Sequence, residues 1–229
     1  MKNYQEMFSL KDKTAVLTGA SGYLGHYFAN GLAQFEASLV LIDIDEKKLS
    51  YLSNELKSKY DVKCLSYVCD ITQPLQVTDT LKTVSKDFNN LDILINNAQA
   101  NDDQLSFEKT KIENWRKTSS VNEEGVFLMS QAVGNYMIEM GNSGSIVQIS
   151  SIYGVLGPDH RIYKDSKNNG SSMGSPAVYS YTKAGIIGLT RYLAAYWAKD
   201  NIRVNVLTPG GVIGNQNDNF KSRYNNRVP

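Results

Sequence analysis

Short apolar runs alternate with longer amphipathic stretches along most of the chain. Runs typical of buried strands occupy residues 13–18, 38–42, 62–68, 91–95, 145–149 and 202–207. Helical spacing of apolar positions predicts helices at about 23–35, 46–59, from 74 onward, 111–140 and 178–199. Strands that alternate with helices require crossover connections, which give a parallel sheet covered on both faces. The pattern therefore predicts an α/β fold with a doubly wound parallel sheet.

Two segments interrupt this alternation. Residues 153–176 form a polar stretch rich in Gly and Ser, and a loop of that length in a compact domain is usually functional. After Gly214 the tail shows no apolar periodicity that predicts a core element. Because no repeat or linker divides the chain, we expect one domain over 1–229, with an insert at about 153–176 and a substrate-loop tail at about 212–229.

Charge and composition exclude several classes of partner. Lys and Arg number 24 against 23 Asp and Glu, a formal net charge of +1, and no long run of like charge occurs. This balance argues against a nucleic-acid or anionic-membrane surface. No stretch approaches the roughly 20 apolar residues of a membrane span, and the N-terminus lacks the apolar run of a signal peptide. We expect a cytoplasmic protein without a metal site, in which Cys64 and Cys69 point to opposite faces of a strand and stay reduced.

A glycine-rich turn follows the first strand. Thr18–Gly25 reads TGASGYLG and opens a helix, the setting in which glycines let a backbone approach a pyrophosphate at a helix N-terminus. A tight turn without a ligand is the alternative. Asp43 ends the second strand, where a carboxylate can bind ribose hydroxyls and repel a 2′-phosphate, or can cap the next helix. The combination favours NAD.

Tyr179 and Lys183 lie four residues apart at the start of a helix, so that their side chains share one face. A tyrosine pKa near 10 is too high for proton transfer at neutral pH, and a neighbouring ammonium lowers it. Tyr163 and Lys167 have the same spacing, but the segment YKDSKNNG around them has no apolar face and ends in turn residues. The continuous apolar stripe after Tyr179 makes it the predicted proton-transfer residue.

Eight motifs occur in one order: TGASGYLG at 18–25, Asp43, CDI at 69–71, INNAQ at 95–99, VN at 121–122, IVQISS at 146–151, YSYTKAG at 179–185 and RVNVLTPGG at 203–211. Over nearly its whole length the chain resembles the short-chain dehydrogenase/reductase family, in its single-domain Rossmann branch. The resemblance implies an NAD-dependent oxidoreductase that moves hydride between a nicotinamide and a secondary alcohol or ketone.

The resemblance also implies a catalytic set of four residues. Tyr179 would exchange the carbinol proton, and Lys183 would bind the nicotinamide ribose and depress the tyrosine pKa. Ser151 would hydrogen-bond the substrate oxygen, and Asn122 would hold a water in a proton relay.

Further residues match the family's cofactor contacts. They are Gly19, Ser21, Gly22, Tyr23 and Leu24 at the pyrophosphate, Asp43 at the ribose, Asp70 and Ile71 at the adenine, Asn96, Asn97 and Ala98 along the cleft, and Tyr179, Lys183, Pro209, Gly210 and Val212 at the nicotinamide end. NAD is expected over NADP because Asp43 is acidic and the glycine turn holds no basic residue.

The chain departs from the family in places that leave alternatives open. Gly22 gives the spacing G-x-x-G-x-x-G, which is commoner in sugar-nucleotide epimerases and dehydratases. An epimerase-like or dehydratase-like enzyme and a non-catalytic NAD-binding sensor are therefore the alternatives, although the complete catalytic set argues against a sensor. Members normally add a further helix and a seventh strand after the tail, so we expect an incomplete C-terminal end. A homodimer or homotetramer through 111–140 and 178–199 is expected by analogy.

The insert is expected to form part of the substrate pocket, and the substrate to be a large, polar, sugar-like small molecule. The insert carries His160, Arg161, Lys164 and Lys167, which could meet a phosphate. The tail adds Asn215, Gln216, Asn217 and Arg223, which suit hydroxyls and amides. The insert weakly resembles that of members tied to nucleotide-activated or surface amino sugars. A solvated loop is the alternative.

Overall fold

The computed structural model describes residues 4–100, 106–168, 171–172 and 174–227. Its centre is a six-stranded sheet in the order β3-β2-β1-β4-β5-β8, in which every neighbouring pair is parallel. The strands are β1 (Thr14–Thr18), β2 (Ser38–Asp43), β3 (Cys64–Val68), β4 (Ile93–Asn96), β5 (Gly144–Ile149) and β8 (Ile202–Leu207). All six predicted strands and the α/β class are confirmed.

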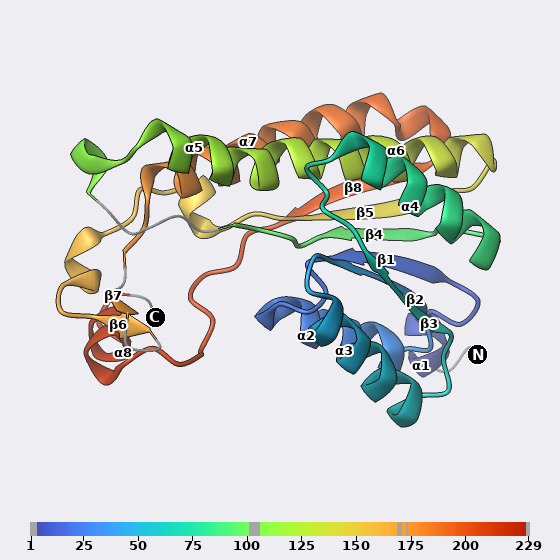
Figure 1. Cartoon of the computed structure of the whole chain (residues 1–229), viewed down its shortest axis with the longest axis horizontal. Coiled ribbons are helices and arrows are strands. Elements are labelled where there is room, and N and C mark those ends of the chain that lie inside the picture. The colour runs from blue at the N-terminus through green and yellow to red at the C-terminus, as the bar shows by residue number, and fades with distance from the viewer. Residues whose placement is uncertain (1–3, 101–105, 169–170, 173, 228–229) are drawn as a thin grey trace.

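Helices cover both faces of this sheet (Figure 1). One face carries α2 (Tyr23–Gln34) and α3 (Glu46–Lys59), and the other carries α4 (Pro74–Asp87), α5 (Ile112–Ser119), α6 (Val126–Glu139) and α7 (Ala177–Tyr196). Strand side chains alternate between the two cores, so that Ala15 and Leu17 pack with α2 and α3 while Val16 packs with α4 and α6. Cys64 and Cys69 are free and buried in different cores, as predicted.

Short elements complete the chain. They are α1 (Tyr4–Phe8) and the 3₁₀ segments η1 (Phe107–Lys109), η3 (Ile152–Gly154), η4 (His160–Tyr163) and η5 (Ala198–Asp200). A two-stranded antiparallel hairpin joins β6 (Lys167–Asn168) to β7 (Ser171–Ser172). Among the described helices, none combines the length and the apolar character needed to cross a bilayer. The described His, Cys, Asp and Glu side chains form no cluster that could hold a metal ion.

The long helix predicted over 111–140 is divided into three parts. Between α5 and α6 lies a π-helical turn, η2 (Ser120–Gly125), which contains Asn122. A Cβ at Gly125 would lie 2.7 Å from the Ile71 side chain, so glycine allows this turn to pack against the segment after β3. Turns of this kind are frequent at functional sites.

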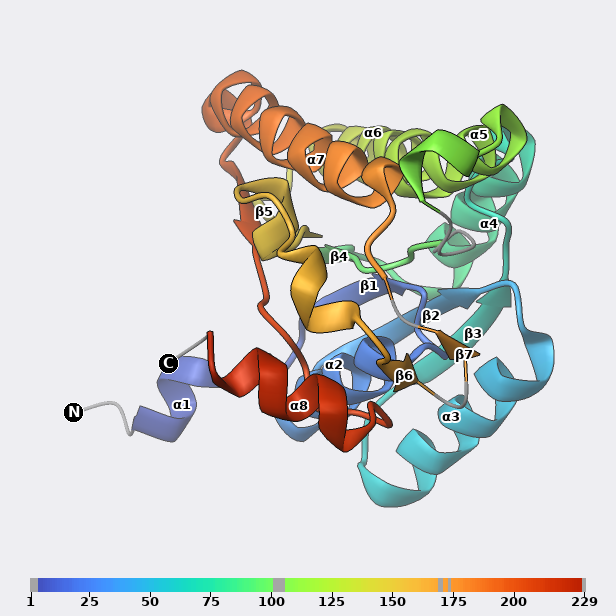
Figure 2. The ribbon, with the colours of Figure 1, turned by 90° about the vertical axis from the view of Figure 1, so that its left-hand side faces the viewer.

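The tail contains a helix that the sequence pattern did not predict, α8 (Asp218–Asn225). It has no buried side chain, and its first turn is capped by Asn217, whose Oδ1 accepts a hydrogen bond from the Phe220 N–H at 3.1 Å. Helix α8 packs against η4 of the insert (Figure 2). Insert residues 153–176 and tail residues 212–227 are hereafter called the cap.

The topology fixes where a ligand can bind. Strands β1 and β4 are neighbours at the middle of the sheet, and the chain continues outward from them in opposite directions. Open parallel sheets of this order bind ligands beyond the carboxyl ends of the strands at such a switch point. Thr18 ends β1 and Asn96 ends β4, so the predicted glycine turn and the INNAQ motif meet there.

Candidate active site

A cleft of about 1130 Å³ lies beyond the carboxyl ends of the strands. Most of the predicted cofactor residues line it: Gly19, Ser21, Gly22, Tyr23, Leu24, Asp43, Asp70, Ile71, Asn97, Ala98, Tyr179, Pro209, Gly210 and Val212. Ser151 lines it as well, whereas the buried side chains of Asn122 and Lys183 lie behind the lining. The fold therefore gathers residues from the whole length of the chain at one edge of the sheet.

Hydrogen bonds from β4 clamp the glycine turn. The Thr18 hydroxyl accepts the backbone N–H groups of Asn97 and Ala98, both at 3.1 Å. In return the Asn97 Nδ2 donates to the carbonyls of Thr18 at 3.1 Å and Gly19 at 2.9 Å. Gly19 has a φ of +62°, and a Cβ there would lie 2.6 Å from the Ala98 Cα. Only glycine fits at this close approach of two backbones.

The N-terminus of α2 opens onto the cleft. Gly22 is the N-cap and makes no side-chain capping bond, so the first N–H groups of α2 have no side-chain acceptor there. Gly25 allows the helix to begin directly on the turn, because a Cβ there would collide with the Gly19 carbonyl oxygen. Exposed N–H groups and the positive end of a helix dipole attract anions. The turn thus fits the pyrophosphate of a dinucleotide.

The Asp43 carboxylate is fixed at the end of β2 by three backbone donors. Its Oδ2 accepts the Ser21 N–H at 2.9 Å, and its Oδ1 accepts those of Ile44 at 2.8 Å and Asp45 at 3.3 Å. The alternative that Asp43 caps the next helix is wrong, because Asp45 caps α3 by accepting the Lys48 N–H at 3.1 Å. Asp43 instead joins β2 to the glycine turn at the wall of the cleft.

Asp70 is held in a similar way after β3. Its Oδ1 accepts two hydrogen bonds from Thr72, one from the backbone N–H at 3.0 Å and one from the side-chain hydroxyl at 2.8 Å.

The expectation that Asn96 lines the cleft is wrong. Its Nδ2 donates to the Ser130 hydroxyl at 2.9 Å on the α6 side of the sheet, and the residue is only 2% exposed. Asn96 is the last residue of β4, and its side chain follows the strand's alternation into the core beneath α6 instead of projecting beyond the strand end into the cleft.

Tyr179 of α7 and Ser151 at the end of β5 lie side by side in the lining of the cleft. Burial raises the pKa of Tyr179, and its hydrogen bond with Ser151 acts in the opposite direction. The Ser151 hydroxyl also accepts the Tyr153 N–H at 3.2 Å. These two hydroxyls are therefore preorganised on one wall, as the proton donor and the hydrogen-bonding partner of a single oxygen would have to be.

Lys183 lies beneath Tyr179 and is 1% exposed. Its Nζ donates to the Ile149 carbonyl at 2.7 Å and lies 5.6 Å from the centre of the Tyr179 ring. Burial lowers the pKa of Lys183 to about 8. The predicted lowering of the Tyr179 pKa by this ammonium is not found here, because burial penalises the charged forms of both side chains.

Asn122 ties three segments together from inside the π-helical turn. Its Oδ1 accepts the Ala100 N–H at 2.8 Å, and its Nδ2 donates to the Ala100 carbonyl at 3.2 Å and the Thr182 hydroxyl at 3.3 Å. It is 1% exposed. Asn122 thereby links the loop after β4 to the helix that carries Tyr179 and Lys183.

Tyr163 also reaches the cleft, although it occupies a different setting from Tyr179. Its hydroxyl donates to the Tyr153 hydroxyl at 2.8 Å. Burial first, and this hydrogen bond second, raise the pKa of Tyr163 far above its usual range. The side chain of Lys167, the other member of the Tyr163–Lys167 alternative, lies outside the described part of the chain.

The basic side chains of the insert were expected to meet a ligand phosphate. His160, Arg161 and Lys164 are exposed and do not line the cleft, so this expectation is wrong for them. Arg161 instead forms two hydrogen bonds to Asp159, at 2.8 and 2.9 Å. In a polar loop the sequence does not distinguish a cation that faces inward from one that pairs with a neighbour.

The predicted tail residues divide in the same way. Asn215 and Gln216 line the cleft, whereas Asn217 caps α8 and Arg223 lies 3.8 Å from Asp165. Sequence reasoning missed the aromatic lining of the cap: Tyr153, Tyr163, Phe220 and Tyr224. The spacing of Phe220 and Tyr224, four residues apart in a tail of otherwise polar residues, is the signal that could have found half of it.

Comparison with known proteins agrees with this arrangement. A family model described as short chain dehydrogenase matches residues 13–225. The NADH-dependent L-xylulose reductase of Ambrosiozyma monospora is 32% identical over 245 residues, which cover 100% of this chain and 85% of the relative. The 2-dehydro-3-deoxy-D-gluconate 5-dehydrogenase of Escherichia coli K12 is 32% identical, with 94% of this chain and 78% of the relative covered.

A solved structure shares both fold and sequence. The short chain dehydrogenase from Leptospira borgpetersenii with bound NAD+ superposes with a TM-score of 0.82 at 32% identity, and 98% of this chain and 80% of that chain are covered. The glycine turn, the ends of the strands and the buried lysine all fit a nicotinamide dinucleotide. The chain therefore belongs to the short-chain dehydrogenase family and is an oxidoreductase that uses a nicotinamide dinucleotide to act on CH–OH groups.

Proposed function

We propose that Tyr179, Ser151, Lys183 and Asn122 carry out the proton-transfer half of a reversible alcohol–ketone interconversion. The observation that carries the proposal is the position of two cleft hydroxyls, Tyr179 and Ser151, directly above a buried lysine. Tyr179 donates the proton to the carbonyl oxygen in reduction and accepts it back in oxidation. Ser151 donates a hydrogen bond to that oxygen as negative charge develops on it.

Lys183 and Asn122 act behind the cleft. The Lys183 ammonium lies 5.6 Å from the centre of the Tyr179 ring, and it returns a proton to Tyr179 through a relay that Asn122 orders. Asn122 suits this role because its amide donates hydrogen bonds to the Ala100 carbonyl in the loop after β4 and to the Thr182 hydroxyl in α7. A nicotinamide bound in the cleft supplies or accepts the hydride.

We propose that NAD is preferred over NADP. The Asp43 carboxylate lines the cleft and keeps its position through three backbone donors, so it can accept ribose hydroxyls without rearrangement. A 2′-phosphate beside it would meet like charge. Lys48 also lines the cleft, but its ammonium pairs with Asp45 at 2.9 Å. The local charge therefore disfavours a phosphate.

The proposed substrate is a polar, sugar-like alcohol or ketone. The substrate end of the cleft presents the hydroxyls of Ser151 and Tyr153 and the amides of Asn215 and Gln216. The xylulose reductase and the dehydrogluconate dehydrogenase both act, by their names, on sugars or sugar acids.

The decisive experiment compares two tyrosine variants. Tyr179→Phe should lower kcat for NADH formation by a factor of about 10³ or more with little change in NAD affinity, because it removes the hydroxyl that accepts the carbinol proton but keeps the aromatic ring in place. Tyr163→Phe is the matched control and should keep kcat within about fivefold. Inactivity of Tyr163→Phe with an active Tyr179→Phe would contradict the assignment. A wild-type enzyme that binds NAD but forms no net NADH with any polyol would favour the epimerase-like or sensor alternatives.

Association through α7 and the α5–α6 segment is part of the same proposal. Exposed aromatic side chains on α7, including the stacked pair Tyr192 and Tyr196 at 5.6 Å, offer an apolar face there. We propose a homodimer or homotetramer, which sedimentation equilibrium would distinguish from a monomer.

A further inference from the structure

Four aromatic side chains form one wall of the cleft at its substrate end. Tyr153 and Tyr163 come from the insert, Phe220 and Tyr224 from α8, and all four line the cleft. The rings of Tyr163 and Phe220 are stacked 5.7 Å apart, and those of Phe220 and Tyr224 lie 5.6 Å apart. Tyr224 is anchored because its hydroxyl accepts the Gly211 N–H at 2.6 Å. We call these four residues the aromatic wall.

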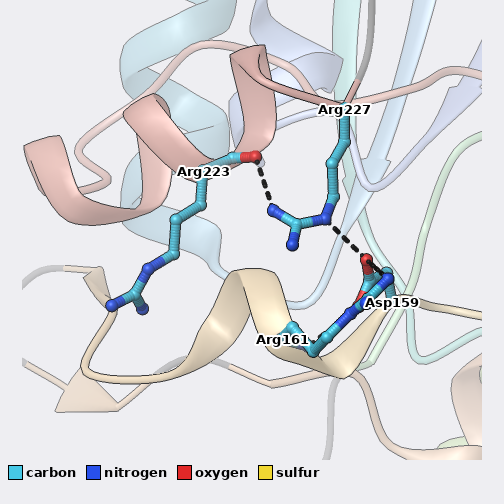
Figure 3. Close-up of polar contacts among 4 residues, drawn as sticks. All are labelled: Asp159, Arg161, Arg223 and Arg227. Carbon is cyan, nitrogen blue, oxygen red and sulfur yellow. Dashed lines mark hydrogen bonds and ion pairs between the residues drawn. The ribbon is translucent and has the colours of Figure 1, made fainter.

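Three described arginines of the cap, Arg161, Arg223 and Arg227, lie near carboxylates of the cap and do not line the cleft. Asp159 binds Arg161 at 2.8 Å and Arg227 at 2.7 Å, so one carboxylate joins the insert to the end of the tail (Figure 3). Arg223 extends from α8 away from Asp159 (Figure 3). Its guanidinium lies 3.8 Å from the Asp165 carboxylate. None of these charged side chains lines the cleft.

The described lining that the cap contributes is therefore uncharged. It consists of Tyr153, Tyr163, Gly174, Ser175, Pro176, Val212, Gly214, Asn215, Gln216, Phe220 and Tyr224. The lysines that line the cleft, Lys48 and Lys117, belong to α3 and α5, outside the cap.

We propose that the cap selects an uncharged polyhydroxy compound and excludes substrates that carry a carboxylate or a phosphate. The aromatic wall would pack against the C–H face of the carbon skeleton, while the tyrosine hydroxyls and the two amides would bind its hydroxyls. An anionic group placed there would lose its hydration without gaining a cationic partner. This inference rests on the proposed dehydrogenase function and narrows its substrate class. It favours the chemistry of a neutral ketose or alditol over that of a sugar acid.

The test measures kcat/KM with NAD+ for matched pairs of equal carbon number: xylitol and xylonate, sorbitol and gluconate, and glucose and glucose 6-phosphate. For at least one pair the neutral member should exceed its charged partner by about 100-fold or more. An equal or higher kcat/KM for the charged member in the pair that turns over best would overturn the inference and leave the dehydrogenase function standing. Absence of NADH formation across all six compounds would overturn the proposed function together with the inference.

Variants of the aromatic wall give a second readout. Phe220→Ala should raise KM for the neutral substrate about tenfold with kcat and NAD affinity nearly unchanged, because one face of the binding surface is lost. Phe35→Ala removes an exposed phenylalanine outside the cleft and is the matched control. An unchanged KM in Phe220→Ala, or an equal loss of NAD affinity, would contradict the assignment.

A third variant tests whether a cation near the cap recognises acids after all. Arg223→Gln should leave the ratio of neutral to charged kcat/KM unchanged. Turnover of xylonate or gluconate that falls tenfold or more in Arg223→Gln would show that Arg223 serves a charged substrate, and the inference would fail.

Discussion

The two walls of the cleft are built by different physical means. On the cofactor side, the glycine turn is locked by buried hydrogen bonds between Thr18 and Asn97 and by backbone contacts that leave no room for a Cβ at Gly19. On the substrate side, the cap is held by stacked aromatic rings and by partly exposed ion pairs such as that between Arg227 and Asp159. The cofactor side of the cleft, from the glycine turn at Thr18–Gly25 to the strand ends that contact it, is part of the core of the sheet and is hereafter called the rigid wall. The cap lies on the outside of that core.

The difference separates two tasks. Buried, fully paired backbone contacts are costly to break, so the nucleotide side keeps its shape without a ligand. Exposed ion pairs contribute little to stability, so we expect the cap to tolerate sequence change more readily than the sheet. On the proposed function, the rigid wall would bind the cofactor and the cap would bind the substrate.

The largest expected effect comes from adding a methyl group at Gly25, where the rigid wall has no space for a Cβ. Gly25→Ala should weaken NAD binding about 100-fold, about 2.7 kcal/mol, because its methyl group would collide with the Gly19 carbonyl and displace the N-terminus of α2. Gly31→Ala, in the same helix, has nothing within 4 Å of its Cβ and should stabilise the protein by about 1 kcal/mol without changing NAD affinity. Titration calorimetry and urea denaturation measure both. Equal NAD affinities for the two variants would show that the turn is not rigid.

The buried Lys183 side chain should make the free energy of unfolding depend on pH. Its pKa in the folded protein is about 8, below the value of about 10.4 expected in the unfolded chain. Between these values the unfolded chain holds a proton that the folded protein lacks, so the free energy of unfolding should rise with pH. We expect a rise of about 2 kcal/mol from pH 8 to 10.5 in wild type relative to Lys183→Met. Parallel urea-denaturation profiles for the two proteins would contradict this.

Much of the rigid wall was predictable from sequence, because local patterns dictate it. Apolar runs gave the six strands, and glycines next to a strand indicated the turn at Gly19 and Gly22. The side chain of Asn96 was expected in the cleft, but it points into the core beneath α6. Successive side chains of a strand point to opposite faces of the sheet, so an error of one residue at the strand end changes the assignment. The π-helical turn around Asn122 escaped prediction because it spans only six residues, too few to show a period of its own in the apolar pattern.

The cap was far less predictable. Helix α8 has no buried residue, so it lacks the apolar stripe by which helices are found. Its stability depends on the Asn217 cap and on Phe220 stacking on Tyr163, a contact between positions 57 residues apart. Pairing of Arg161 with Asp159 rather than with a ligand also depends on three-dimensional placement. The roles assigned to individual cofactor and catalytic residues stay predictions until variants are measured.

Asp43 tests whether the rigid wall alone sets cofactor choice. Asp43→Ala should lower the ratio of kcat/KM for NAD to that for NADP about tenfold or more, because it removes the charge that faces a 2′-phosphate. Ser21→Ala is the control and should leave the ratio unchanged, since Ser21 binds Asp43 through its backbone N–H. A ratio that does not move in Asp43→Ala would place the selectivity elsewhere, with Lys48 as the first candidate.

The smallest expected effect comes from the ion pairs of the cap. Arg161 first, and Arg227 in addition, hold the pKa of Asp159 well below its usual range. A carboxylate with a depressed pKa strengthens the folded state above the ordinary pKa near 4, and this contribution is lost as pH falls. At neutral pH, Asp159→Asn should therefore loosen the contact between insert and tail. We expect a two- to threefold rise in KM for the polyol with unchanged NAD affinity.

Salt separates this effect from a general change in stability. Exposed ion pairs are screened over about 3 Å at 1 M ionic strength, so the KM difference between wild type and Asp159→Asn should shrink in 1 M NaCl. Asp79→Asn removes the partner of Lys82 in an exposed pair on α4, at 3.5 Å, and is the control for loss of surface charge. A KM difference that persists in high salt, or that Asp79→Asn reproduces, would show that Asp159 does not hold the cap together. The contrast between the two walls would then rest on the aromatic contacts alone, because Tyr163 and Phe220 stack without charge.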